Sequence, residues 1–172
     1  MISLRKSDYP LVMFNQIIEM LSLPAWRTDS WKAEQLQVAV AALLVQAAAM
    51  DDHFDPEERA TIERLLAIGF KLDADQVRAV LATAEDAAAR SNQLYAFTRV
   101  VVERMEADAR IGLVEMLWEV ALSDGLLSPD EDALIRRIAG LIYVSDHDRG
   151  AARKRVLQRR CIAGRKPENQ KE

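Results

Sequence analysis

The sequence predicts an all-α fold, a single compact bundle of about seven to nine helices. Three observations carry this prediction. Alanine, leucine and glutamate dominate long stretches, and these residues lose little conformational entropy in a helix. The chain contains only six glycines and five prolines. Apolar residues recur at helical spacing almost throughout, and no strand-like alternation persists.

Start and stop signals divide the chain into eight expected helices. Pro24 ends the first helix, and Asp29 or Ser30 can cap the second. Pro56 and Pro129 each suit the first position of a helix, where the missing N–H costs nothing. The expected helices are residues 10–21, about 30–50, 56–69, a segment after Asp73, a segment after Ser91, 111–122, a segment from Pro129, and about 146–160.

A shift of 73 residues matches the sequence to itself. The aligned segments are residues 44–64, LVQAAAMDDHFDPEERATIER, and residues 117–137, LWEVALSDGLLSPDEDALIRR. Each copy has an apolar helix, a loop that opens with an aspartate, a cap, a proline and two acids before the next helix. Two such helical hairpins can cover each other's apolar faces around a pseudo-twofold axis. We therefore predict two pseudo-symmetric helix–acidic loop–helix repeats, which should superpose over residues 36–81 and 109–157.

The repeated pattern A-x-x-D-x-x-x-[DS]-P-[ED]-E resembles the TerB-like domain family of tellurite resistance proteins. The helix that begins Leu94-Tyr95-Ala96-Phe97-Thr98-Arg99 is similar to the segment that connects the two copies in that family. The likeness covers roughly residues 36–157. It implies a helical bundle with a pseudo-symmetric core, a divalent-metal site on acidic residues, and an association with tellurite resistance and stress response. No enzymatic activity comes with the resemblance.

The predicted organisation has three parts: an N-terminal apolar helix and linker at residues 1–28, a TerB-like helical domain at 29–160, and a flexible C-terminal tail at 161–172. The single Cys161 excludes an internal disulfide framework and favours a reducing compartment. The longest apolar stretch, residues 36–50, falls short of the roughly 20 residues that span a bilayer. A cytoplasmic location is therefore expected.

The acidic loops provide the candidate metal site, for calcium, magnesium or manganese. Such hard cations take several oxygen ligands, and clustered acids on a turn supply them. The candidate ligands are Asp51, Asp55 and Glu58 in the first copy, with Asp124 and Glu131 as their counterparts in the second. Capping offers a second interpretation, with Asp55 and Ser128 as N-caps and Glu58 and Glu131 completing capping boxes. Capping leaves Asp51 and Asp124 over, although their side chains could bond to the amides of the following turn. Both interpretations stay open.

Charge is unevenly distributed along the chain. The formal net charge is −4, yet residues 149–166 contain eight basic residues and no acidic one. No aromatic residues interleave with these charges, so no nucleic-acid partner is expected. A solvated helix face, favoured by its own C-terminal dipole, is the preferred interpretation. An anionic partner, phospholipid included, is the alternative.

Protein contacts are the expected mode of action. The apolar segment at residues 9–26 favours docking on the bundle or on a dimer mate over peripheral contact with a membrane, because its polar face lacks lysine and arginine. No phosphate-binding loop, dinucleotide-binding glycine motif or nucleophile elbow occurs, so no enzyme is predicted. The expected function is a TerB-like accessory domain with a divalent ion at an acidic loop. The alternative is a metal-independent scaffold or homodimer whose acids only cap helices.

Overall fold

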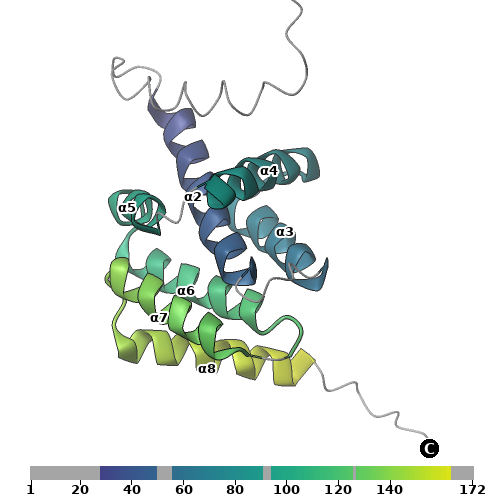
Figure 1. Cartoon of the computed structure of the whole chain (residues 1–172), viewed down its shortest axis with the longest axis vertical. Coiled ribbons are helices and arrows are strands. Elements are labelled where there is room, and N and C mark those ends of the chain that lie inside the picture. Colours follow the sequence, from purple (N-terminus) through teal and green to yellow (C-terminus); the bar gives the residue numbers. More distant parts are fainter. Residues whose placement is uncertain (1–27, 50–55, 91–93, 126, 164–172) are drawn as a thin grey trace, which may run out of the picture. The chain divides into compact units, whose positions relative to one another are not determined.

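The described part of the chain is built from α-helices. The computed structural model describes residues 28–49, 56–90, 94–125 and 127–163, and within these ranges there are seven helices and no strand (Figure 1). The helices are α2 (Thr28–Ala48), α3 (Pro56–Phe70), α4 (Ala74–Arg90), α5 (Leu94–Arg104), α6 (Ala107–Ala121), α7 (Pro129–Leu141) and α8 (Asp146–Ala163). The predicted all-α class is confirmed. The helix predicted at residues 10–21 lies outside the described residues.

The chain divides into two units, residues 1–34 and 35–172. In the first unit the structure describes residues 28–34, which form the beginning of α2. The features below belong to the second unit. Among the described residues, none of the helices is long and apolar enough to cross a membrane.

Local sequence signals set most of the helix boundaries. Both α3 and α7 begin at the predicted prolines, Pro56 and Pro129. Asp73 and Gln76 cap α4 reciprocally: the Asp73 side chain accepts the Gln76 N–H at 2.9 Å, and the Gln76 side chain accepts the Asp73 N–H at 2.9 Å. The start of α6 was predicted at Ile111, but the helix begins at Ala107. Its N-cap residue forms no side-chain cap hydrogen bond, so the sequence carried no capping signal there.

The core of the second unit draws on every described helix. α2 contributes a run that is buried on all sides, with Ala41, Ala42, Leu43 and Leu44 each 0% exposed. A helix that is apolar around its whole circumference belongs inside a bundle, and this one lies in the core cluster. α6 packs against α8, α7 and α3, while α3 also packs against α4 and α5 against α7 (Figure 1).

Burial is alike at positions related by the 73-residue shift. Leu44 and Leu117 are both 0% exposed, and so are Ile62 and Ile135. These are the pairs that the self-match placed on the inner faces of the two hairpins. The match in burial agrees with the predicted repeat, and the superposition of the two hairpins stays a prediction.

The ends of α3 and α7 share an unusual turn. Each is followed by a non-glycine residue in the left-handed region, Lys71 with φ 55° and Tyr143 with φ 58°. The next residue folds its N–H back onto the helix, from Leu72 to the Ala67 carbonyl at 3.1 Å and from Val144 to the Ala139 carbonyl at 2.9 Å. These are Schellman-type terminations.

A helix cap follows each of these turns. Asp73 caps α4, and the Ser145 hydroxyl accepts the Asp148 N–H at 3.1 Å at the start of α8. Asp73 and Ser145 are 72 positions apart, one fewer than the shift that relates the prolines. The second copy is therefore one residue shorter between its proline and its next cap. With that correction, the turn and the cap that precede α4 correspond to those that precede α8.

Candidate functional site

The second acidic loop lies between α6 and α7. Leu122 forms the C-cap of α6 and donates its N–H to the Trp118 carbonyl at 3.1 Å. Asp124 is exposed on the loop. Gly125 follows with φ +86°, and its N–H donates to the Leu122 carbonyl at 3.1 Å. A residue with a Cβ would be strained at this φ, so glycine allows the chain to reverse immediately after the aspartate.

Glu131 serves as a capping residue of α7. Its carboxylate accepts the Ser128 N–H at 2.7 Å, and its own N–H donates to the Ser128 hydroxyl at 3.1 Å. The two bonds form a complete capping box, with Pro129 at the first helical position. Glu131 is only 5% exposed. The capping interpretation of Ser128 and Glu131 is therefore realised in the structure.

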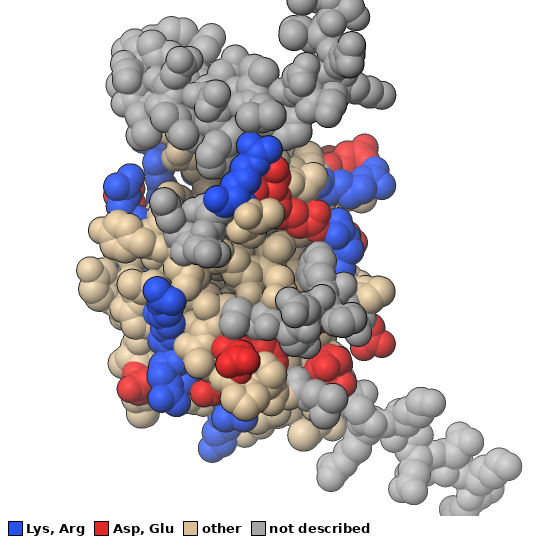
Figure 2. Space-filling view, viewed as in Figure 1, with Lys and Arg blue, Asp and Glu red and all other residues tan. Residues whose placement is uncertain are grey.

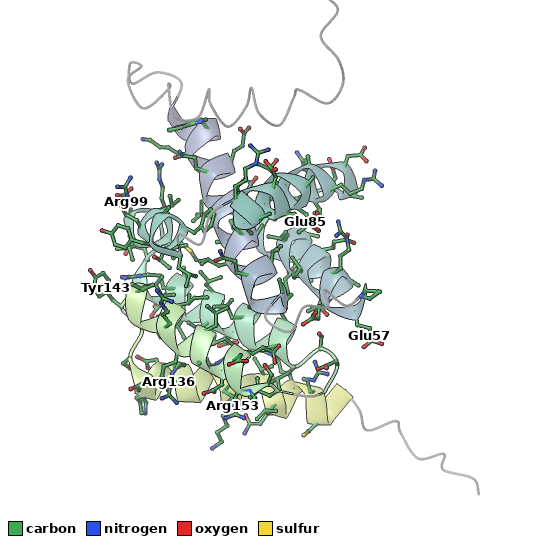
Figure 3. All side chains as sticks on the ribbon, viewed as in Figure 1. Glu57, Glu85, Arg99, Arg136, Tyr143 and Arg153 are labelled. Atoms are coloured by element: carbon green, nitrogen blue, oxygen red, sulfur yellow. The ribbon has the colours of Figure 1, made fainter. Side chains whose placement is uncertain are left out.

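The first acidic loop is described only at its end. Asp51 and Asp55 lie outside the described residues. Glu58 occupies the third position of α3 and is 6% exposed, which matches its counterpart Glu131. Glu57 precedes it on the exposed side of the first turn (Figure 3).

The five predicted metal ligands thus fall into three groups. Glu58 and Glu131 are buried in the first turns of α3 and α7, Asp124 is exposed on its loop, and Asp51 and Asp55 are outside the described ranges. Within those ranges, no group of three or more histidine, cysteine, aspartate or glutamate side chains is arranged to hold a metal ion. A full ligand set in the first copy would need the residues of the loop itself.

A cluster of charged side chains between α6 and α8 was not predicted. The Glu115 carboxylate accepts hydrogen bonds from Arg155 Nε at 2.6 Å and from Arg159 Nη1 at 2.8 Å. Arg159 also donates from Nη2 to Glu119 at 2.9 Å, and Glu119 accepts from Arg64 of α3 at 3.0 Å. We call these five residues the α6–α8 charge cluster. It joins three helices that are far apart in the sequence.

The electrostatics of this cluster favour its charged form. Burial raises the pKa of Glu115, but the hydrogen bonds and charges of Arg155 and Arg159 outweigh it, so the net pKa is lowered. The hydrogen bond to Glu115 raises the pKa of Arg159. The carboxylate side chains of Glu115 and Glu119 are 19% and 21% exposed. This partial shelter makes the ion pairs stronger than those on an open surface.

Two more arginines of α8 contact α6. Arg160 donates from Nη2 to the Ser123 carbonyl at 3.0 Å, at the end of α6. The guanidinium of Arg153, a residue labelled in Figure 3, lies over the Trp118 ring at 5.2 Å from its centroid. At this distance the pair forms a cation–π contact.

The basic stretch lies on an exposed face of α8, as the sequence predicted. Four of its arginines, at positions 153, 155, 159 and 160, also contact α6 or the loop that follows it. Charges of both signs also alternate over the visible surface in Figure 2. The sequence did hold a signal: Glu115 and Glu119 are four residues apart, as are Arg155 and Arg159. Acid and base pairs with equal spacing on two helices can meet when the helices pack.

The histidine and the cysteine that the structure describes both lie on the surface. His147 is 91% exposed at its side chain and lies 3.4 Å from Asp148. Hydrogen bonds from Ser145 and His147 lower the pKa of Asp148. Cys161 is an exposed free thiol on α8. These groups do not form a catalytic cluster in the described part of the chain.

Comparison with known families identifies the domain. The family described as tellurite resistance protein TerB matches residues 37–154. The chain belongs to the TerB family. The matched segment runs from α2 into α8 and contains both acidic loops. Of the charge cluster it contains Arg64, Glu115 and Glu119, and it ends one residue before Arg155. No curated protein and no solved structure matches the chain.

Proposed function

We propose that this TerB domain is a non-enzymatic accessory module that acts through protein contacts and binds one divalent cation at its first acidic loop. The observation that carries the proposal is which residues of the second loop cap α7 and which do not. There, Ser128 and Glu131 satisfy the capping of α7, and Asp124 takes no part in that box. By the repeat, Asp51 is the acid of the first loop that capping does not require.

The first loop is the better of the two for a cation. It carries acids at positions 51, 52, 55, 57 and 58, whereas the second carries them at 124, 130 and 131. Calcium takes six to eight oxygen ligands, and magnesium and manganese also prefer oxygen, so the number of carboxylates favours the first loop. Glu58 brings one carboxylate to the base of this loop, at the first turn of α3.

Thermal unfolding with and without metal tests the proposal. Chelator-treated protein should melt at a higher temperature in millimolar calcium, magnesium or manganese, because an ion that binds only the native state stabilises it by mass action. Asp51→Asn should abolish this shift and leave the metal-free protein folded. Asp108→Asn is the matched control, since Asp108 is an exposed acid in the first turn of α6. Equal melting temperatures in all three metals and in chelator would reject the cation.

A metal-independent scaffold is the second candidate, and the capping box of α7 favours it. If Asp55 acts as Ser128 does, Asp55→Ala should destabilise the metal-free protein by about 1 kcal/mol through loss of the cap. In this candidate every acid of the loops contributes to helix ends or turns. If Asp55→Ala destabilises the protein and no metal raises the melting temperature of the parent protein, the metal-independent scaffold is the correct function.

The cellular setting is also a proposal. Membership of the TerB family supports a role in tellurite resistance or a related stress response, and the exposed thiol of Cys161 suits a reducing cytoplasm. The partner is a protein, with a second copy of the chain as the simplest case. Deletion of the gene should then increase sensitivity to tellurite, and the Asp51→Asn variant should fail to restore growth. If the Asp51→Asn variant restores growth fully, the first acidic loop is not needed for tellurite resistance.

A further inference from the structure

The second acidic loop already has a positive charge beside it. Arg160 donates to the carbonyl of Ser123, and Ser123 directly precedes Asp124. The last carbonyls of a helix carry partial negative charge, and α6 has no basic residue in its own last turn. Ser123 lies two residues beyond the end of α6, so the positive charge next to this helix end comes from Arg160 of α8.

Neighbouring contacts fix α8 in the position that this bond requires. Arg159 precedes Arg160 and binds Glu115 and Glu119, which lie in the last two turns of α6. Arg153 lies over Trp118, whose carbonyl accepts the N–H of the C-cap Leu122. Arg160 thus approaches the end of α6 from a helix that is held at several points along α6.

The aligned positions of the first copy carry different residue types. With the 72-residue shift between caps, Arg159 and Arg160 correspond to Ala87 and Ala88 of α4. With the 73-residue shift, Glu115 corresponds to Ala42 of α2. Ala42 and Ala87 are buried, so the first copy packs small apolar side chains where the second uses ion pairs. The two copies have therefore diverged at the end of the helix that precedes the acidic loop.

We propose that Arg160 is the resident cation of the second loop. Its guanidinium neutralises the end of α6 next to Asp124 and keeps the loop ordered without a metal ion. A divalent cation at Asp124 would lie beside this fixed positive charge, which opposes its binding. The chain therefore takes one divalent ion, at the first loop, and this stoichiometry rests on the proposed function above. The role of Arg160 in ordering the loop does not depend on it.

Amide hydrogen exchange of the full chain in chelator tests the ordering role. Arg160→Gln should speed exchange at Leu122, Ser123 and Gly125 by about three- to tenfold, since one charge-assisted hydrogen bond at an exposed site is lost. The amides of α2 should be unaffected. Lys154→Gln is the matched control, because Lys154 is exposed on the same helix and makes no hydrogen bond or ion pair in the described part of the chain. The proposal would be overturned if the loop amides exchanged no faster in Arg160→Gln than in Lys154→Gln. It would also be overturned if exchange in α2 increased as much as in the loop.

A second variant separates charge from geometry. Arg160→Lys keeps the positive charge on a different side chain, so its loop exchange should lie closer to the parent protein than to Arg160→Gln. Exchange as fast as in Arg160→Gln would contradict the role of the charge.

Calorimetric titration with calcium or manganese tests the stoichiometry. Asp124→Asn should retain the binding of one ion per chain. Loss of binding in Asp124→Asn, or two ions per parent chain, would show that the second loop takes metal and would overturn the assignment of Arg160. No binding in the parent protein would remove the cation from the proposed function. In that case the exchange results alone decide whether Arg160 orders the loop.

Discussion

Replacement of Glu115 by glutamine removes the central charge of the α6–α8 charge cluster while it keeps the side-chain size. Glu115 accepts from Arg155 at 2.6 Å and from Arg159 at 2.8 Å, with its own side chain 19% exposed and the arginines 44% and 51% exposed. A sheltered hydrogen bond to a charged group contributes about 1.5–3 kcal/mol, and an exposed ion pair about 0–1 kcal/mol. The exposure of both arginines favours the lower range. We expect Glu115→Gln to lower the free energy of unfolding by about 1.5 kcal/mol at pH 7.

Urea unfolding at low ionic strength is the appropriate assay, since guanidinium chloride would screen the charges. The matched control is Glu103→Gln. Glu103 pairs with Arg99 at 3.4 Å on the surface of α5, with side chains 54% and 59% exposed, and its loss should cost less than about 0.5 kcal/mol. Equal destabilisation by the two variants would refute the argument that shelter strengthens the cluster.

The pH dependence gives an independent check on Glu115. Burial raises the pKa of this carboxyl, but the hydrogen bonds from both arginines lower it by more, so the folded-state pKa lies below the ordinary value of 4.5. A group with a lowered folded-state pKa contributes stability above its unfolded pKa and loses it as the pH falls through the folded pKa. The difference between parent and Glu115→Gln should therefore be constant near neutral pH and shrink below about pH 4.5. A difference that stays unchanged down to pH 2 would contradict the electrostatic origin.

Three further changes test the core, a helix start and a helix end. Leu117→Ala should lower the free energy of unfolding by about 2–5 kcal/mol because Leu117 is 0% exposed, and an unchanged urea midpoint would show that it lies outside the core. Ser128→Ala should cost about 1 kcal/mol in the same assay by removing the hydroxyl that accepts the Glu131 N–H, and no loss would mean that the cap is dispensable. Tyr143→Gly should raise the melting temperature slightly, since Tyr143 is 79% exposed and glycine relieves its φ of 58° at a gain of up to about 1 kcal/mol. A lower melting temperature would show that the tyrosine contributes more by packing than its conformation costs.

The helix starts could be predicted because their causes are local. A cap such as Asp73–Gln76 or Ser128–Glu131 closes hydrogen bonds between residues three apart, so the residues that make it are visible in one short segment. The apolar faces were predictable for the same reason, since Leu117 and Ile135 follow a helical period. Where no side chain caps a helix, as at the start of α6, the prediction failed.

The candidate site was predictable only in part. The sequence indicated that Glu131 could either cap α7 or bind a cation, and the structure shows the capping bond at 2.7 Å. The sequence did not indicate that Tyr143 adopts the left-handed conformation, because glycine is the residue usually found at that position of the turn. The one-residue difference between the copies became visible only after both turns and both caps were in place.

The sequence by itself determined the helical class, the family and the residues that begin α3, α4 and α7. Each of these follows from periodicity, from a motif or from contacts within a few residues. The tertiary structure alone decided that Glu115 meets Arg155 and Arg159, 40 and 44 residues away, and that Arg160 reaches the end of α6. Periodicity fixes which side chains share a face of a helix. Which faces meet depends on how all the helices bury their apolar surfaces together, and that choice is made by the whole core.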